Sequence, residues 1–439
     1  MTRRLIDGTK TAPSLTQQAV ATAPATEVAA NVPIDTYIVK VASRCNLNCS
    51  YCYVYNKGDE SFRSQPYRMR PATVSALLSR VANHCLEEKL EHLTFIFHGG
   101  EPLLAGSDFF RQFVTEAETV LKGHATLRYA LETNGTLLTS DWLELFRDLN
   151  VSFGISLDGP EEIHDRNRVN HSGAGSYSQV RRALDLVRAD RRLDPLFGGV
   201  LTVIDLAAEP LSLYRHLKEI GIRRCDFLLP DGTYDNPPPM LSFDGLDTPY
   251  ADWLIAIFDE WFRSEDTMLS IRIFENIINL LFDPGGGNET MGGGQNGVLV
   301  IETDGGIEPV DVLKICGPSF TKLGLNVERN EIHDVYSSEL VQLYHHGAAG
   351  LCAKCRTCPV VAVCGGGYLP HRYSSPGGFA NPSIYCRDLI KLITHVRSSV
   401  LATIPEKLRQ KLGMEPLSYE DIISAHRPHG DETGQLPTR

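Results

Sequence analysis

Apolar positions along the chain alternate between two spacings. From residue 36 onward, short runs rich in β-branched residues are followed by stretches whose apolar residues recur every three or four positions. The first spacing is typical of strands and the second of amphipathic helices. The pattern predicts strands at residues 36–42, 93–98, 127–133, 151–157, 197–204 and 225–229. It predicts helices near residues 71–90, 107–122, 139–149, 176–190 and 209–220.

The order of these elements predicts an α/β fold with a parallel sheet. Parallel neighbours need a long return path between them, and a helix between consecutive strands provides it. A curved partial barrel and a doubly wound sheet both satisfy this order.

The pattern changes after residue 230. A Pro-rich loop leads into an amphipathic helix expected at 248–264, a Gly-rich segment at 284–297 and a hairpin from 298. We expect the Gly-rich segment to act as a lid that orders when a peptide binds. The expected units are a mobile arm (1–34), a barrel (35–234), a bridging helix with the lid (235–297), a Cys-rich domain (298–400) and a tail (401–439).

Composition and charge exclude several classes of protein. The formal net charge is −12, and no block of basic residues interrupts the chain, which disfavours nucleic-acid binding. The longest apolar runs are strand-sized, so no membrane span is expected. The N-terminus lacks the apolar stretch of a secretory signal, which predicts a cytoplasmic protein.

Cysteines fall into two groups that indicate metal chemistry. Three of the eleven, Cys45, Cys49 and Cys52, follow the first predicted strand with the spacing C-x3-C-x2-C. Soft thiolates select zinc or iron–sulfur clusters, and a structural zinc site needs four ligands. A cubane [4Fe–4S] cluster held by three cysteines keeps one iron open for a small molecule. In a cytosolic protein, metal or catalytic roles are favoured over disulfides.

This motif and three others resemble the radical S-adenosylmethionine (SAM) superfamily. The others are "HGGEP" (98–102), "ETNGTLL" (132–138) and "SLDGPEEIHDRNR" (156–168), each at a predicted strand end. The resemblance implies a partial six-stranded barrel, with the doubly wound sheet as the alternative. It also implies that the open iron binds SAM, which is cleaved to a 5′-deoxyadenosyl radical.

The same resemblance implies a set of SAM contacts. Tyr51 precedes the third cysteine, where the family packs an aromatic side chain on adenine, and Glu101 with the preceding glycines receives the SAM amino group. Arg168 is preferred over Arg166 as the partner of the SAM carboxylate. The full set is Tyr51, Gly99, Gly100, Glu101, Asn134, Ser156 and Arg168.

The C-terminal cysteines resemble the SPASM extension of peptide-modifying radical SAM enzymes. The matching positions imply one fully ligated auxiliary [4Fe–4S] cluster on Cys355, Cys358, Cys364 and Cys386. Tyr368 stands where the family has a fourth core cysteine, and Cys316 and Cys352 alone cannot fill a second cluster. We therefore expect one auxiliary cluster rather than two. Tyr368 and His371 stand where they could line the pocket, but packing roles are preferred for them.

Further similarity to three-residue cyclophane-forming enzymes implies a specific reaction. These enzymes bond the Cβ of one residue of a ribosomal precursor peptide to an aromatic ring two positions upstream. Asp311, at the expected junction of the barrel and the Cys-rich domain, is the candidate base. The implied partners are the precursor peptide and an electron donor such as flavodoxin or ferredoxin.

The sequence also allows other functions. Thioether formation, epimerisation and formylglycine formation are alternatives within the superfamily; Cys316 keeps a hydrogen donor available for epimerisation. Formylglycine-forming enzymes are expected to hold two complete auxiliary clusters. A zinc-binding interaction module is an alternative of another class, and it would be colourless where iron–sulfur protein is brown.

Overall fold

One ten-stranded sheet organises the molecule. The computed structural model describes residues 30–243, 246–264 and 268–426. The sheet order is β10-β9-β8-β1-β2-β3-β4-β5-β6-β7. The strands are β1 (Thr36–Ala42), β2 (His92–Gly99), β3 (Thr126–Thr133), β4 (Val151–Ser156), β5 (Phe197–Val203), β6 (Arg224–Leu228), β7 (Ser270–Ile271), β8 (Val298–Ile301), β9 (Gly306–Glu308) and β10 (Leu325–Asn326).

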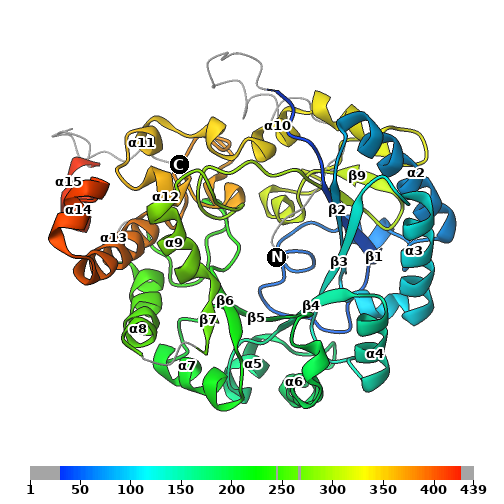
Figure 1. The fold of residues 1–439 in the computed structure, drawn as a ribbon, viewed down its shortest axis with the longest axis horizontal. Helices are drawn as coiled ribbons and strands as arrows, with labels where there is room; N and C mark the ends of the chain where they lie inside the picture. Colours follow the sequence, from blue (N-terminus) through cyan, green and yellow to red (C-terminus); the bar gives the residue numbers. More distant parts are fainter. Residues whose placement is uncertain (1–29, 244–245, 265–267, 427–439) are drawn as a thin grey trace.

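Strands β1 to β6 are the six parallel strands that the sequence predicts. Each pairs in parallel with the next, beginning with Thr36 opposite Thr94. They form a curved arc with the helices on its outside (Figure 1). The helices of this part are α2 (Pro71–Glu88), α3 (Ser107–Val120), α4 (Ser140–Asp148), α5 (Glu161–Asn167), α6 (Tyr177–Ala189) and α7 (Pro210–Glu219).

Amphipathic spacing explains why these helices cover the sheet. In α2, Val74, Leu77, Leu78 and Val81 recur at helical spacing and are all buried. Pro71 occupies the first turn, where the missing N–H has no intrahelical acceptor, and Lys89 ends the helix in the left-handed region at φ 53°.

The sheet continues beyond the boundary expected near residue 298. β8 pairs in parallel with β1, and β9 pairs antiparallel with β8. The predicted hairpin therefore extends the barrel sheet on the side of β1. A second, smaller hydrophobic cluster lies where this extension meets the C-terminal region, and it contains Ile38, Val300, Val310 and Tyr368.

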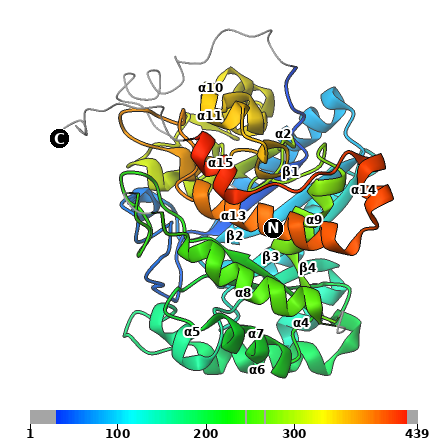
Figure 2. The ribbon, with the colours of Figure 1, turned by 90° about the vertical axis from the view of Figure 1, so that its left-hand side faces the viewer.

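The first part of the C-terminal region packs near α2 and β9, and its later part packs along the other edge of the arc. Its longest helix, α13 (Cys386–Thr403), contacts α8 (Pro249–Arg263) and α9 (Arg272–Phe282), as seen in Figure 2. Its remaining helices are η4 (Asp311–Cys316), η5 (Ile332–Ser337), α10 (Glu339–His345), η6 (Gly347–Gly350), α11 (Ala353–Arg356), α12 (Val361–Cys364), η7 (Leu369–Arg372), α14 (Glu406–Leu412) and α15 (Tyr419–Ala425). Short helices η1 (Ser61–Ser64), η2 (Pro102–Ala105) and η3 (Arg191–Leu193) join barrel elements.

Two expectations fall mainly or partly outside the described residues. Most of the arm expected at 1–34 lies there, as does the part of the expected tail after residue 426. In the described part of the chain, every helix is too short or too polar to cross a membrane.

Candidate active site

The three cysteines of the first motif lie in the loop after β1 and border one cavity of about 160 Å³. The other lining residues come largely from the C-terminal ends of β2 to β6. Carboxyl ends of neighbouring parallel strands meet at the same edge, which explains why distant motifs converge here. Six of the residues expected to bind SAM border this cavity: Tyr51, Gly99, Gly100, Asn134, Ser156 and Arg168.

Two glycines allow the cysteine loop to approach β2 closely. Gly99 has φ +148°, and a Cβ there would lie 2.0 Å from the carbonyl oxygen of Ala42. A Cβ on Gly100 would lie 2.1 Å from the hydroxyl of Tyr55. Any side chain at either position would push the loop away from the strand, so both glycines are required by the backbone packing.

Burial makes the three thiols poor acids in the absence of a cation. It raises the pKa of Cys45 to about 12 and that of Cys52 to about 11, and it also raises the pKa of Cys49. Thiolates in this position need a neighbouring positive charge, and metal ions supply one. The donor set therefore fits a bound iron–sulfur cluster.

The arrangement does not suit a single metal ion. Among the residues that the structure describes, no three His, Cys, Asp or Glu side chains are grouped as ligands of one ion. A mononuclear zinc site requires such a group. In a [4Fe–4S] cluster each cysteine binds a different iron, so the sulfurs need not converge on one point.

Arg168 occupies the cavity wall, whereas Arg166 does not. The Nη1 of Arg168 donates to the hydroxyl of Tyr51 at 2.7 Å, and the hydroxyl of Tyr51 in turn donates to Asp158. Arg166 instead pairs with Asp205 at 2.9 Å. Arg168 is thus a buried cation bonded to the hydroxyl of Tyr51, the side chain expected to pack on adenine. This position supports the preference for Arg168 over Arg166.

Exchanging Arg168 for Gln is expected to weaken SAM binding about tenfold or more. A guanidinium paired with a carboxylate contributes about 1.5–3 kcal/mol, and about 1.4 kcal/mol is a factor of ten in affinity. Isothermal titration of SAM into anaerobically reconstituted protein measures the change. Arg166→Gln is the matched control and should bind SAM as the wild type does. Equal affinities in the two variants would contradict this assignment.

Glu101 lies outside the residues that border the cavity. Its carboxylate accepts from the backbone N–H of Leu103 at 3.0 Å, the hydroxyl of Thr133 at 2.8 Å and the backbone N–H of Asn134 at 2.8 Å. These bonds join the turn after β2 to the end of β3. The structure therefore gives Glu101 a positioning role: it fixes Asn134, whose amide lies 3.7 Å from the sulfur of Cys45.

Glu132 borders the cavity and is not among the residues expected from the sequence. Its Oε1 accepts from the hydroxyl of Ser156 at 3.1 Å, and burial raises its pKa to about 7. The sequence signal that could have indicated Glu132 is the alternation of side chains between the two faces of a strand. Glu132 stands two residues before Asn134 and so points to the same face.

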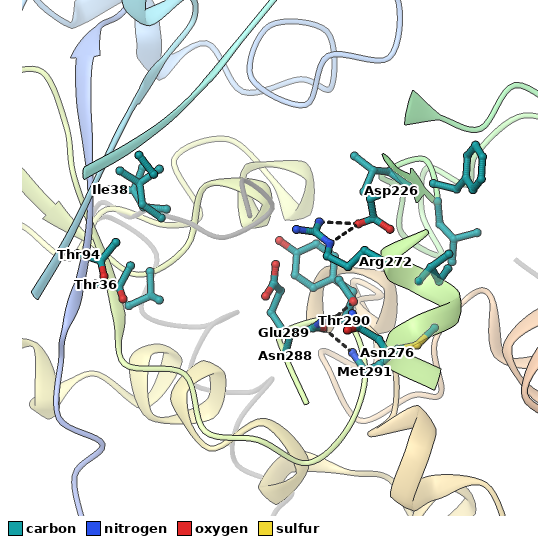
Figure 3. A pocket seen from close by; sticks show the side chains of 18 of the residues that line it. Thr36, Ile38, Thr94, Asp226, Arg272, Asn276, Asn288, Glu289, Thr290 and Met291 are labelled. Carbon is teal, nitrogen blue, oxygen red and sulfur yellow. Dashed lines mark hydrogen bonds and ion pairs between the residues drawn. The ribbon is translucent and has the colours of Figure 1, made fainter. Parts of the chain in front are cut away.

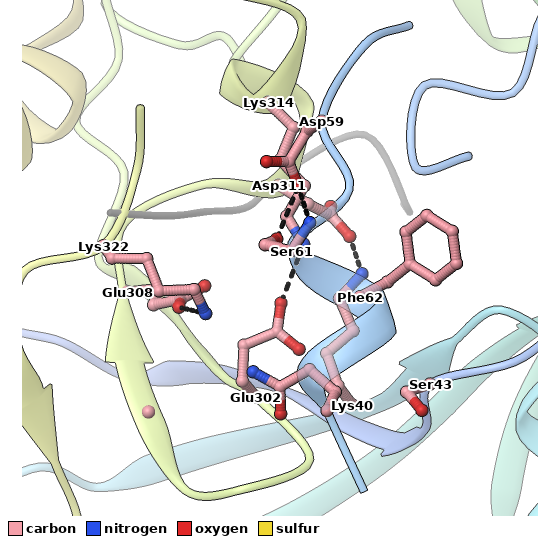
Figure 4. Close-up of polar contacts among 12 residues, drawn as sticks. Lys40, Ser43, Asp59, Ser61, Phe62, Glu302, Glu308, Asp311, Lys314 and Lys322 are labelled. Atoms are coloured by element: carbon pink, nitrogen blue, oxygen red, sulfur yellow. Dashed lines mark hydrogen bonds and ion pairs between the residues drawn. The ribbon is translucent and has the colours of Figure 1, made fainter. Parts of the chain in front are cut away.

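Asp311 is fully buried at the start of η4, beside the cavity but not in its lining. The hydroxyl of Tyr53 donates to its Oδ1 at 2.9 Å, and Lys40 forms an ion pair with its Oδ2 (Figure 4). His98 places Nδ1 3.8 Å from the same oxygen and 3.3 Å from the Lys40 Nζ. Tyr53 and His98 both border the cavity, so they connect it to the buried carboxylate.

Burial opposes the positive charge of Lys40, whereas the nearby carboxylate of Glu302 favours it. Burial lowers the pKa of Lys40 to about 7, and burial together with Lys40 holds the pKa of His98 well below its ordinary value. Glu302 lies nearby, where it accepts from Lys314 at 3.0 Å. Burial raises the pKa of Glu302, but Lys314 and Lys40 outweigh it and bring the value to about 2. No motif indicates Lys40, which looks like an ordinary strand residue.

The second group of cysteines surrounds a separate small cavity. Cys355, Cys358, Cys364 and Cys386 all border it: they come from α11, the loop between α11 and α12, the last residue of α12 and the first residue of α13. These four are the residues expected to hold the auxiliary cluster. Burial raises the pKa of Cys364 to about 12 and that of Cys386 to about 11, so these thiols also need a cation.

The remaining C-terminal cysteines differ in their surroundings. Cys352 hydrogen-bonds with the thiol of Cys355, and this bond lowers the pKa of Cys352 to about 5. Cys316 is buried in the smaller hydrophobic cluster together with Tyr368, Tyr373 and Phe379. Cys316 and Tyr368 thus both belong to the smaller hydrophobic cluster, and the number of auxiliary clusters stays a prediction.

A known family model matches much of the barrel. Residues 39–199 match the model described as the radical SAM superfamily.

Curated relatives cover most of the chain. A cysteine-type anaerobic sulfatase-maturating enzyme of Clostridium novyi is 25% identical over 359 residues, covering 80% of this chain and 92% of that protein. A serine-type anaerobic sulfatase-maturating enzyme of Bacteroides thetaiotaomicron is 25% identical over 389 residues, covering 83% and 89%. The expected closeness to cyclophane-forming enzymes is not supported by these relatives.

A solved structure shares the fold. The protein named anSMEcpe with bound AdoMet superposes with a TM-score of 0.71 at 23% identity, covering 84% of this chain and 98% of that one. The same protein is also solved with AdoMet and a peptide bound. The predicted α/β fold, a partial radical SAM barrel with a C-terminal Cys-rich region, is confirmed.

Proposed function

We propose that this protein is a radical SAM enzyme that oxidises one side chain of a peptide, in a reaction of the sulfatase-maturating type that converts Ser or Cys to formylglycine. The observation that carries the proposal is the cavity at the strand ends, where three half-buried thiols meet Arg168, Tyr51 and Asn134. The sulfatase-maturating relatives, which match along most of their lengths, support the peptide substrate and the type of reaction.

The cofactors follow from the two groups of thiols. Cys45, Cys49 and Cys52 hold a [4Fe–4S] cluster that binds SAM, and Cys355, Cys358, Cys364 and Cys386 hold one auxiliary [4Fe–4S] cluster. When bound, these groups supply hydrogen-atom abstraction from the peptide and an acceptor for one electron. A flavodoxin or ferredoxin is the proposed external electron donor.

The protein's own residues orient SAM and the peptide. Arg168 pairs with the SAM carboxylate, while Tyr51 packs on the adenine and holds the guanidinium through its hydroxyl. Glu101 keeps the ends of β2 and β3 together, so that Asn134 stays beside Cys45. The buried walls exclude water, which protects a reactive intermediate from side reactions.

Asp311 is the proposed acceptor of the proton that the oxidation releases. Converting the CH₂OH of serine to an aldehyde removes two hydrogens: one leaves as an atom, and the other as a proton and an electron. Cysteine loses the same two hydrogens to give a thioaldehyde, which water converts to the aldehyde with release of H₂S. The proton reaches Asp311 through Tyr53 or His98, the two neighbours of Asp311 that border the cavity.

Replacing Asp311 by Asn is expected to lower the rate of peptide modification about a hundredfold or more, while SAM binding persists. Removing a positioned base typically costs about 10²–10⁴ in rate. Liquid chromatography with mass spectrometry measures the modified peptide in single-turnover assays. Asp247→Asn, on the exposed surface, is the control. Wild-type modification rates in Asp311→Asn would remove Asp311 from the mechanism.

The reaction type is tested by co-expression followed by mass measurement and carbonyl labelling. The substrates are sulfatase peptides with Cys or Ser and any small peptide encoded beside the gene. Formylglycine from serine loses two hydrogens, and formylglycine from cysteine also exchanges sulfur for oxygen. Both products carry an aldehyde that reacts with a hydrazide. A modified peptide that does not react with hydrazide would contradict formylglycine formation.

Cyclophane formation is the second candidate. It is favoured by the presence of only one complete set of cysteines for an auxiliary cluster among the described residues. Formylglycine-forming enzymes were expected to hold two complete sets, whereas Cys316 and Tyr368 here lie in apolar packing. A cyclophane also loses two hydrogens, but it gives no hydrazide adduct and silences fragmentation across three residues that begin at an aromatic. An unchanged mass with inverted stereochemistry would indicate epimerisation. A two-hydrogen loss that maps to cysteine, without an aldehyde, would indicate a thioether.

A further inference from the structure

A second and larger space, the lower chamber, lies in the half of the barrel away from the cysteines. It measures about 370 Å³ and is bordered by the N-terminal halves of β1 to β4, by β6, by α9 and by Asn288–Met291 of the Gly-rich segment. In Figure 3, Thr36, Ile38 and Thr94 lie on one side of this space, and Arg272 and Glu289 lie on the other.

The same strand faces build the lower chamber and the SAM cavity. On β2, Thr94 and Ile96 border the lower chamber, and His98 borders the SAM cavity. On β3, Ala130 borders the lower chamber and Glu132 the SAM cavity. Side chains two residues apart share one face of a strand.

Leu228 borders both spaces, so the lower chamber adjoins the SAM cavity inside the barrel. Tyr368 and His371, for which packing roles were preferred over lining a pocket, are buried residues that also border the lower chamber. Both the barrel and the Cys-rich region thus contribute to its wall.

The walls of the lower chamber combine apolar surface with neutral polar groups. Ile38, Ile96, Ala130 and Val298 supply an apolar side. Hydroxyls and amides supply hydrogen-bonding groups at its rim: Thr36, Thr94, Ser152, Asn276 and Asn288. Such a surface suits a peptide, whose backbone needs hydrogen-bond partners and whose side chains need apolar contacts.

Its charges do not suit an anionic small molecule. The two guanidinium groups at the wall, on Arg128 and Arg272, are matched in number by the carboxylates of Asp226 and Glu289. Arg272 Nε donates to Asp226 at 2.9 Å. The Arg272 side chain is 40% exposed, so the chamber reaches solvent there and a chain longer than the chamber can continue outward.

We propose that the lower chamber binds an uncharged, partly apolar segment of the substrate peptide, next to the residue that is modified. This rests on the proposed function, which places the reacting residue in the adjoining SAM cavity. The segment lies between the apolar side of β1 to β3 and the Arg272–Asp226 pair. The residues flanking the reactive position therefore contribute affinity and select the substrate.

A variant that fills the chamber tests this proposal. Ala130→Phe projects a ring into the space from β3, and Ala72→Phe, on the exposed face of α2, is the matched control. The probes are two synthetic versions of the peptide that the wild type modifies: one complete, the other lacking the flanking residues. Fluorescence anisotropy with SAM-loaded protein measures the affinity of each.

Ala130→Phe is expected to bind the complete peptide about tenfold or more weakly, because the apolar side chain of the segment loses its burial. The short peptide should bind equally to all three proteins. Iron content and far-UV circular dichroism verify folding, and Ser152→Leu, a smaller filling change on β4, replaces Ala130→Phe if that variant does not fold.

Two outcomes would overturn the proposal, and they are distinguishable. Unchanged affinity of a folded filling variant for the complete peptide would refute the lower chamber alone. A wild-type protein that neither binds nor modifies any peptide would refute the proposed function, and this inference with it.

Discussion

Replacing Cys49 by Ala is expected to abolish SAM cleavage and to remove the iron of one cluster. Cys49 is one of the three half-buried thiols at the cavity, and no fourth cysteine borders the cavity among the described residues to take its place. Without a complete ligand set the cluster is lost, and the reaction that depends on it stops. Iron and sulfide content, with 5′-deoxyadenosine formation under reducing conditions, measure both effects.

Two matched variants separate this effect from general loss of cysteine. Cys85→Ala removes a buried thiol that borders neither cysteine cavity, and its iron content should match the wild type. Cys386→Ala should lose iron while still forming 5′-deoxyadenosine, because Cys386 borders only the second cavity. Full SAM cleavage by Cys49→Ala would contradict the assignment of the first cluster.

Replacing Lys40 by Met is expected to destabilise the protein by about 3–5 kcal/mol. Lys40 is 3% exposed and Asp311 is fully buried, so the substitution leaves a carboxylate without its cation in a dry environment. Breaking a buried pair from one side costs this much because the remaining charge keeps its desolvation penalty. Chemical denaturation followed by circular dichroism measures the loss.

The double variant Lys40→Met, Asp311→Leu provides the control for that explanation. Removing both charges leaves no unpaired group, so most of the lost stability should return. Lys40→Met alone as stable as the wild type would mean that the pair contributes nothing to the fold. A double variant less stable than Lys40→Met would indicate that packing, rather than the unpaired charge, sets the cost.

The barrel could be predicted from the sequence because its strands are regular and its motifs stand at their ends. All six barrel strands lie within two residues of their expected bounds, and α2 begins at the expected Pro71. Several other helices were not expected. The helix α9 follows a two-residue strand and a polar segment, and α5 overlaps the motif around Arg168. The apolar residues of α9 nevertheless recur at helical spacing and are buried, so this helix was open to prediction, whereas α5 has no apolar face that would indicate it.

The candidate site could be predicted only where a residue belongs to a sequence motif with a known chemical role. The cysteines and Arg168 carry their chemistry in their residue type and spacing, so they could be placed in advance. Lys40 and His98 gain their roles from tertiary contact with Asp311, a residue more than two hundred positions away. The contact between Glu101 and SAM that its motif implies stays a prediction, whereas the hydrogen bonds of Glu101 with Leu103 and Asn134 could not be foreseen from the sequence.

Transfer of deuterium from the peptide to 5′-deoxyadenosine tests the central claim most directly. The peptide found by co-expression is synthesised with deuterium at Cβ of the modified residue and incubated with reconstituted protein, SAM and reductant. If the protein abstracts hydrogen from the peptide, deuterium appears in 5′-deoxyadenosine in step with the modified product. Modified peptide accompanied by unlabelled 5′-deoxyadenosine would contradict direct abstraction from that carbon.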